Sequence, residues 1–304
     1  MSNALANAKS PYLRGHAGNP VDWQEWTPTT LARARAEDRP LFVSVGYSAC
    51  HWCHVMAREA FSDAEVARIL NENFVSIKID REERPDLDAV FQTAHQALTG
   101  RGGGWPLSIF LEPEKLTPFF AGTYFPLTPR YGMPGFADLL QRILAFYAEQ
   151  RAVLGEQGER LRAMLAERLG ADAAPAAGAL SGAPVRIATA NLAAHFDPVH
   201  GGFGGAPKFP QSPQLAFLLA RGESGGLRRT LETMARGGLN DHVGGGFFRY
   251  TVDAAWRVPH FEKMLYDNAQ LLALYAEGAV RFDSPEFRAT ALATAKFMDA
   301  ELAL

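Results

Sequence analysis

Residues 40–56 read PLFVSVGYSACHWCHVM, and this stretch decides how the first half of the chain folds. The apolar, β-rich run at 40–47 predicts a short buried strand. Cys50 and Cys53 follow directly, where the pattern predicts the start of a helix. They are the only cysteines among the 304 residues. A strand that leads into a helix through a Cys-x-x-Cys pair indicates thiol–disulfide chemistry.

The spacing of the two cysteines suits disulfide exchange. Unpaired N–H groups at a helix N-terminus lower the pKa of a thiol, so Cys50 is expected to be the attacking thiolate. Cys53 lies one helical turn later and is expected to resolve the mixed disulfide. His51 and His54 are expected to add positive charge that favours the thiolate. With His51 and Trp52 between the cysteines, we expect a less reducing pair than one that encloses Gly-Pro.

Two other interpretations of the pair stay open. Cys50, Cys53 and His54 are zinc-ligand types, but a structural zinc site usually needs a second pair of ligands. The sequence has no second Cys-x-x-Cys, so His16 and His95 would have to converge on the first. The other interpretation is a pair of buried, inert thiols. We therefore predict no metal and no other cofactor.

Helical and strand patterns alternate from about residue 20 to 150. Helices are expected at 22–38, 64–74, 85–98 and 136–150, and strands at 40–47, 75–80, 107–113 and 119–125. The last two strands flank a proline-bounded turn and predict an antiparallel hairpin. This order predicts an α/β domain with a mixed sheet covered on both faces.

Three further residues are candidates for the same site. Pro106 follows a glycine-rich stretch and Trp105, and a proline there marks the start of a strand. A cis Trp-Pro bond would bring this backbone close to the cysteines, whereas the alternative is an ordinary loop proline. Asp80 ends the strand at 75–80, at the sheet edge where ligands gather. It is expected either to accept a proton from Cys53 or to form a charged cap with its neighbours.

The second half of the chain has a different character. Residues 170–184 are rich in Ala, Gly and Pro, which predicts a linker. Helical periodicity dominates after the linker, apart from a possible short ribbon at 244–253. We therefore expect an all-α region from residue 185 to residue 304.

Several strings resemble one known family. They are SPYL, NPVDW, IKIDREERPDLD, GGWPLSIFLEPE and FAGTYFP in the first half, and GGFGGAPKFP and DHVGGGFFRYTVDAAWRVPHFEKMLYDNAQL in the second. They resemble the spermatogenesis-associated protein 20 family. This resemblance implies a thioredoxin-like domain at 1–169 and, after the linker, part of an (α/α)6 six-hairpin glycosidase-like toroid at 185–304. It also implies that the toroid does not close within these residues.

The second half also gathers polar residues that could carry chemistry: Asp241, His242, Arg249, His260, Glu262 and Asp267. Pro259 suits the first turn of a helix, on which His260 and Asp267 would share one face. In a toroid, such carboxylates could supply acid and base for a sugar reaction. The alternative is that they hydrogen-bond the glycine-rich loops and hold them in place.

Composition narrows the partners and the location. The net charge of −3 offers no broad basic surface, which argues against nucleic acid. No secretory signal or membrane-spanning apolar run occurs, so a cytoplasmic protein without membrane contact is expected. We expect a thiol–disulfide oxidoreductase that acts on protein or small-molecule thiols. The alternatives are a carbohydrate-active protein with a regulatory or vestigial first domain, and a non-catalytic scaffold.

Overall fold

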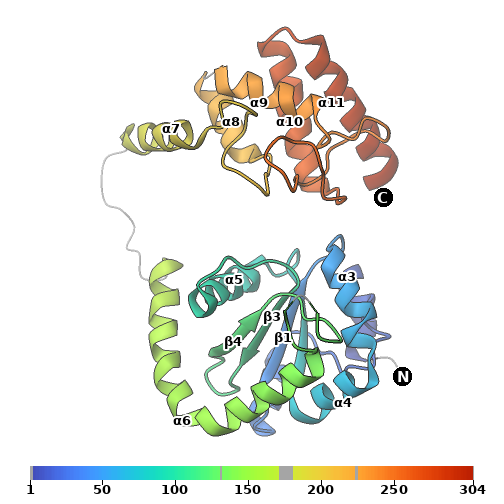
Figure 1. The fold of residues 1–304 in the computed structure, drawn as a ribbon, viewed down its shortest axis with the longest axis vertical. Coiled ribbons are helices and arrows are strands. Elements are labelled where there is room, and N and C mark those ends of the chain that lie inside the picture. The colour runs from blue at the N-terminus through green and yellow to red at the C-terminus, as the bar shows by residue number, and fades with distance from the viewer. Residues whose placement is uncertain (1–2, 131, 171–180, 223–224, 304) are drawn as a thin grey trace. The chain divides into compact units, whose positions relative to one another are not determined.

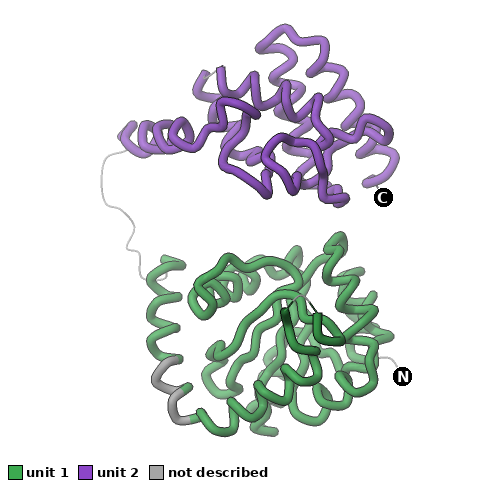
Figure 2. The backbone as a smooth tube through the Cα atoms, in the orientation of Figure 1, with its two compact units in different colours: residues 1–176 green, residues 177–304 purple. Residues whose placement is uncertain are grey.

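The structure is a computed structural model that describes residues 3–130, 132–170, 181–222 and 225–303. The chain divides into two compact units, residues 1–176 and residues 177–304 (Figure 2). Most of the predicted linker, residues 171–180, lies outside the described residues. The predicted domain boundaries therefore stay a prediction.

Unit 1 is built on a four-stranded sheet of order β2-β1-β3-β4 (Figure 1). The strands are β1 (Leu41–Gly46), β2 (Val75–Asp80), β3 (Leu107–Leu111) and β4 (Pro118–Gly122). β1 runs parallel to β2 and antiparallel to β3, and β3 runs antiparallel to β4. The expected mixed sheet is confirmed, and its strand order and directions are those of a thioredoxin-like domain.

The helices of unit 1 follow the predicted order. They are η1 (Ala4–Asn7), α1 (Pro11–Arg14), α2 (Pro28–Ala36), α3 (His51–Arg58), η2 (Ala60–Ser62), α4 (Ala64–Asn73), α5 (Pro85–Thr99) and α6 (Phe136–Arg168). Two boundaries differ from the prediction. α2 starts late because the side chain of Thr27 caps the helix and Pro28 takes its first turn. α6 runs past residue 150, because Leu161 and Leu165 extend its apolar stripe into the core of the sheet.

The two faces of the sheet bury different kinds of side chain. One face is aliphatic and packs against α2, α5 and the C-terminal part of α6. The other face is aromatic, with ring contacts among Trp23, Phe42, Phe61, Phe74, Phe110, Phe125 and Phe136. Every residue of β1, β2 and β3 is buried, so the polar side chains of these strands, Ser44, Ser76, Lys78, Asp80 and Ser108, are also covered.

Unit 2 is largely helical. Its helices are α7 (Ala183–His195), α8 (Ser212–Arg221), α9 (Gly225–Arg236), α10 (Leu265–Arg281), α11 (Pro285–Phe297) and the π-helical turn η3 (Met298–Leu302). Helices α8 to α11 enclose one apolar core, with Trp256 and Phe247 contributed by the loops. That these helices form part of a toroid remains a prediction. Among the described residues, no helix combines the length and the apolar character needed to cross a membrane.

The expected helix start at Pro259 is wrong. Backbone N–H groups of His260 and Glu262 donate to Tyr250 and His260 instead of to residues four positions earlier. The N–H of Arg249 in turn donates to Glu262. These pairings hold residues 259–263 as an irregular, non-helical segment, and α10 begins only at Leu265. The possible ribbon at 244–253 forms isolated bridges rather than a described strand pair.

Candidate active site

Cys50 and Cys53 lie at the start of α3, just beyond the carboxyl end of β1. Cys50 is the N-cap residue, and its Sγ accepts a hydrogen bond from the backbone N–H of Cys53 at 3.2 Å. The two Sγ atoms form a disulfide, and the two Cα atoms are 5.2 Å apart. Both residues are buried, with 2% and 0% of their surface exposed. The pair therefore lies at the positive end of the helix dipole, within reach of unpaired N–H groups.

The N-terminal segment closes the buried side of this site. Ser10 caps α1, and its Oγ donates a 2.6 Å hydrogen bond to Oδ2 of Asp80. The other oxygen of Asp80 accepts the N–H of Glu82 at 2.9 Å. Asp80 is the register partner of Gly46, the last residue of β1. A buried carboxylate thus lies at the same sheet edge as the cysteines.

Two further ionisable groups lie on the aromatic face beneath the site. Lys78 is buried among the rings of Tyr12, Trp23 and Phe61, with Nζ 4.6 to 5.4 Å from their centroids. Its Nζ donates to Oγ of Ser44 at 2.9 Å. Burial lowers the pKa of Lys78 from 10.5 to about 7.

His16 follows α1 and is also buried. Burial, aided by the nearby charge of Lys78, lowers the pKa of His16 to about 3, against the opposing effect of its hydrogen bond to Asn19. An imidazole with this pKa is neutral at pH 7. The buried side of the disulfide therefore holds a neutral imidazole and an amine that titrates near neutrality.

The outer side of the site is an aromatic groove. Trp52, between the two cysteines, is 41% exposed, and its ring lies 4.9 Å from that of Tyr124. A hollow of about 570 Å³ is lined by Trp52, Gly102, Gly103, Gly104, Trp105, Thr123, Tyr124 and Met133. An exposed tryptophan beside a glycine-lined hollow offers a partner chain both contact area and close backbone approach.

The Trp105–Pro106 segment borders this groove. The peptide bond between the two residues is cis, and Pro106 is buried at the start of β3. The indole of Trp105 donates to Asp88 at 2.9 Å and lies edge-on to Tyr47, 5.8 Å away. The guanidinium of Arg81 stacks on the same indole at 4.1 Å. These contacts hold the segment beside the loop that carries the cysteines.

The two histidines of the motif have different surroundings. His51 is exposed, and its ring lies edge-on to Trp52 at 5.5 Å. His54 is also exposed, with Nε2 2.6 Å from the carbonyl oxygen of Ser48. The second contact fixes one ring nitrogen of His54 to the loop before the helix. Their effect on the thiols stays a prediction.

The zinc alternative required these cysteines and histidines to converge. In the part of the chain that the structure describes, no group of three or more His, Cys, Asp or Glu side chains is placed to hold a metal ion. The two sulfur atoms are bonded to each other, and a zinc ligand must be a free thiolate. His16 and His95 hydrogen-bond to Asn19 and Thr99.

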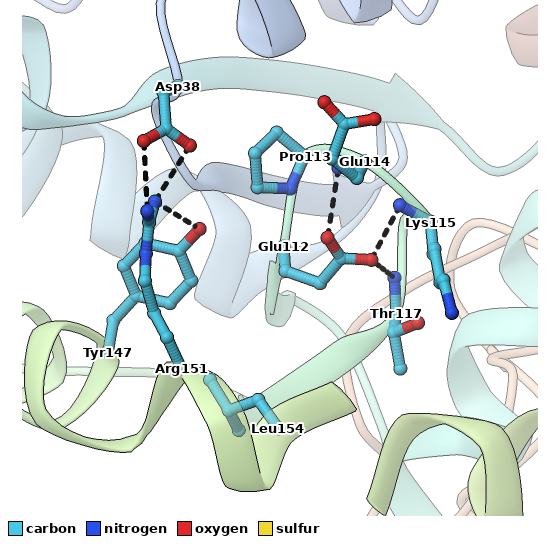
Figure 3. A pocket seen from close by; sticks show the side chains of 9 residues that line it. All are labelled: Asp38, Glu112, Pro113, Glu114, Lys115, Thr117, Tyr147, Arg151 and Leu154. Atoms are coloured by element: carbon cyan, nitrogen blue, oxygen red, sulfur yellow. Dashed lines mark hydrogen bonds and ion pairs between the residues drawn. The ribbon is translucent and has the colours of Figure 1, made fainter. Parts of the chain in front are cut away.

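Unit 1 has another hollow at the end of the sheet opposite to the cysteines, shown in Figure 3. There Arg151 donates to both oxygens of Asp38, at 2.9 and 2.7 Å, and to the hydroxyl of Tyr147 at 3.0 Å. The carboxylate of Glu112 accepts N–H groups of the turn that follows β3. Since these charged groups bind one another, this hollow adds no candidate site.

In unit 2, Asp241 and His242 bind their own loop. Oδ1 of Asp241 accepts the N–H groups of Val243 and Gly244, and Oδ2 accepts Nζ of Lys263 at 2.6 Å. Burial opposes ionisation of Asp241, but the bonds from Lys263 and these N–H groups lower its pKa to about 2. Nε2 of His242 lies 3.0 Å from the carbonyl oxygen of Gly237. These contacts favour the loop-holding interpretation of both residues.

The other four predicted residues of unit 2 form one network. Glu262 is buried, and it pairs with Arg249 at 2.8 Å and with Nε2 of His260 at 3.1 Å. Nε of Arg249 lies 3.6 Å from Asp267. Arg249 and Asp267 also line a hollow of about 280 Å³ beside Phe209. The structure thus brings these four together and leaves Asp241 and His242 in a separate cluster.

Sequence reasoning missed Tyr12 and Gly46, which lie beside Cys53, and Lys78, which packs against Tyr12. Lys78 alternates with apolar residues along β2, a pattern that is typical of a side chain on the solvent face. Tyr12 belongs to an extension that precedes the first predicted strand. Only the motif SPYL pointed to it, without a role.

Solved thioredoxin-like proteins are similar to unit 1. A thioredoxin from Thermus thermophilus is 25% identical, with a TM-score of 0.32 over 42% of this chain and 89% of its own. A DsbH oxidoreductase is 14% identical, with a TM-score of 0.31 over 41% of this chain and 83% of its own. A disulphide isomerase from Xylella fastidiosa Temecula1 is 15% identical, with a TM-score of 0.32 over 41% of this chain and 97% of its own.

Sequence relatives cover both units. Residues 2–166 match a family described as Thioredox_DsbH, protein of unknown function, DUF255. Spermatogenesis-associated protein 20 is 44% identical in Homo sapiens and 43% in Rattus norvegicus, each over 94% of this chain. Uncharacterized protein B0495.5 of Caenorhabditis elegans is 43% identical over 90% of this chain. The chain spans 37% to 38% of the length of these relatives. By these matches the chain belongs to the spermatogenesis-associated protein 20 family.

Proposed function

We propose that this chain is a thiol–disulfide oxidoreductase in which Cys50 and Cys53 cycle between disulfide and dithiol. The observation that supports this most is the position of Cys50 as the N-cap of α3, bonded to Cys53 at the edge of a thioredoxin-like sheet. A helix N-terminus stabilises a thiolate, and a partner one turn away gives a high effective concentration for resolution.

The exchange proceeds in two displacements. The thiolate of Cys50 attacks a substrate disulfide, so that one substrate sulfur leaves as a thiolate and the other bonds to Cys50. The thiolate of Cys53 then attacks Sγ of Cys50, and the second substrate thiolate leaves. Two electrons have passed from the cysteine pair to the substrate. The reverse sequence oxidises a substrate dithiol by the same steps.

The neighbouring residues are assigned supporting roles. His51 and His54 favour the thiolate by their charge, and Trp52 and Trp105 offer aromatic surface to the substrate. Pro106 presents its backbone to an extended substrate segment beside the cysteines. Asp80 is the proton acceptor on the buried side. The substrate is a protein or small-molecule thiol or disulfide.

The test is differential alkylation at defined ratios of reduced to oxidised glutathione. The wild-type chain should pass from two modified thiols to none as the ratio becomes oxidising. Cys53→Ser should retain a mixed disulfide on Cys50 because the resolving thiol is missing. Cys50→Ser, the matched control, should accumulate much less. If alkylation of the wild-type thiols does not change with the glutathione ratio, and no adduct is trapped in Cys53→Ser, the proposal is wrong. The non-catalytic scaffold would then be the favoured interpretation.

A second candidate function rests on unit 2. The rings of Phe209, Tyr250 and His260 stack at 4.6 and 4.7 Å beside the hollow that Arg249 and Asp267 line. Stacked rings next to a guanidinium and a carboxylate suit a carbohydrate ligand. Sugar-dependent thermal stabilisation of the full-length protein, lost in Asp267→Ala, is expected if unit 2 binds sugar. Equal melting with and without sugar would exclude it.

A further inference from the structure

Tyr12 has a buried hydroxyl that the proposed exchange does not use. The residue lies in α1 and is 4% exposed. Its Oη has no hydrogen-bond partner among the residues that the structure describes. Buried hydroxyl groups are nearly always paired, so an unpaired one in a closely packed site requires an explanation.

The hydroxyl and the sulfur of Cys53 border the same small space beside Gly46. A Cβ atom at position 46 would lie 2.2 Å from Oη of Tyr12 and 2.7 Å from Sγ of Cys53. Both atoms therefore occupy the space that a side chain at the end of β1 would fill. Glycine is required at position 46 because of this space, since its backbone lies in an ordinary strand.

We propose that the hydroxyl of Tyr12 is the hydrogen-bond donor that stabilises the thiolate of Cys53 whenever the disulfide is open. This inference rests on the proposed function. A disulfide sulfur is a weak acceptor, which explains why the hydroxyl is unpaired in the oxidised state. A thiolate carries a full negative charge, and charge-assisted hydrogen bonds are about twice as strong as neutral ones.

The role requires no transfer of the tyrosine proton. When the thiolate of Cys53 attacks Cys50, the new S–S bond forms and the substrate leaves with the electron pair of the bond that breaks. Tyr12 keeps its proton and loses only its acceptor. Burial, together with the charges of Asp80 and Tyr47, raises the pKa of Tyr12 far above its usual value, so the group remains a donor throughout.

Other ionisable groups lie near Tyr12 and Cys53, and their titration must be distinguished from that of Cys53. They are Lys78 and Asp80 of β2, Tyr47 after β1, His16 after α1 and His54 of α3. Burial lowers the pKa of Lys78 to about 7, which falls within the range of the assay. Each comparison is therefore repeated in a Lys78→Met background.

The test follows the resolving step with 5,5′-dithiobis(2-nitrobenzoate). The reduced chain releases one nitrothiobenzoate when Cys50 forms the mixed disulfide and a second when Cys53 displaces it. In Tyr12→Phe the second release should slow about tenfold at pH 7, and its pH profile should move up by about one pH unit. The control Tyr147→Phe, which removes a hydroxyl at the opposite end of the sheet, should leave both unchanged.

A second measurement does not depend on exchange. The pH profile of iodoacetamide alkylation of Cys53 is compared in Cys50→Ser with and without Tyr12→Phe, and the same upward shift is expected. If wild type resolves normally and neither profile moves in Tyr12→Phe, the Tyr12 inference is wrong while the proposed function stands. If wild type releases no second nitrothiobenzoate, the proposed function fails. Changed thermal stability alone would mark Tyr12 as a packing residue and overturn the inference.

Discussion

Replacing Lys78 with methionine should stabilise unit 1 at neutral pH, with an effect that fades as the pH rises. Lys78 is 1% exposed, and its ammonium group donates a hydrogen bond to the neutral hydroxyl of Ser44. The rings around it offer cation–π attraction but no formal negative charge. Folding therefore either strips the ammonium of water or removes its proton, and both are unfavourable.

The magnitude follows from the pKa. An unfolded lysine has a pKa of 10.5, and burial lowers it to about 7 in the folded chain. Each tenfold change in proton affinity is worth about 1.4 kcal/mol, so this lysine lowers the free energy of unfolding at pH 7 by about 4 kcal/mol. Between pH 7 and 10.5 the unfolded state binds the extra proton, so raising the pH stabilises the wild type. From pH 7 to pH 9 the gain is about 2 kcal/mol.

The assay is urea unfolding of the oxidised chain at pH 6 to pH 9, followed by tryptophan fluorescence. The informative quantity is the unfolding free energy of Lys78→Met minus that of wild type. It should be largest at pH 6, and fall by about 2 kcal/mol between pH 7 and pH 9. His16, with its pKa near 3, and Tyr12, with its raised pKa, do not titrate in this window. Lys9→Met removes one charge from an exposed position and controls for net charge.

A difference that stays constant from pH 6 to pH 9 would refute the reasoning, because it would mean that the folded chain keeps its proton at position 78. Lys78→Met also leaves Oγ of Ser44 without its donor, a loss of about 1 kcal/mol. That loss is independent of pH, so it lowers the difference in unfolding free energy by the same amount at every pH. The slope is therefore the decisive measurement.

Three further predictions concern buried contacts. Gly46→Ala should destabilise unit 1 by about 2 kcal/mol or more in thermal melts, because its Cβ would overlap a buried hydroxyl and a sulfur. Lys208→Met should destabilise unit 2 by about 3 to 5 kcal/mol in urea, because it strips the 2.6 Å partner from Asp197. Asn268→Ala should lower the melting temperature of unit 2 by several degrees, because the N–H and C=O of Phe247 both lose their side-chain partner.

The strands and the helix that begins at Cys50 could be predicted because local patterns determine them. Short apolar runs bounded by turn residues placed β1, β2 and the hairpin within a few residues. The pattern at 75–80 shows the limit of this reasoning. The expected buried strand is confirmed there, but nothing in the local pattern places Lys78 under Tyr12 and Trp23, which lie far away in the sequence. Burial by a distant segment leaves no local signal.

The loops of unit 2 were predicted less well for a similar reason. Pro259 and the spacing of His260 and Asp267 fit a helix. The non-helical form prevails because the segment pairs with residues 249–251 and because Glu262 forms ion pairs with Arg249 and His260. Helical propensity is a weak local preference, and these tertiary contacts outweigh it. The arrangement of these polar residues therefore depends on partners that the spacing does not reveal, and their role stays a prediction.

Lys78 and Lys208 are both buried, and a comparison of their partners bears on the chemistry of the cysteine site. Lys208 is fully buried, and its Nζ meets Asp197 at 2.6 Å and the carbonyl oxygen of Ala254 at 3.0 Å. These two bonds compensate the buried charge of Lys208, so a structural role explains its burial. Lys78 has no comparable carboxylate bond among the described residues and lies directly behind Tyr12. A buried amine with a pKa near 7, packed against the tyrosine that borders Cys53, is typical of a site selected for proton chemistry rather than stability. This supports redox exchange over an inert pair of thiols.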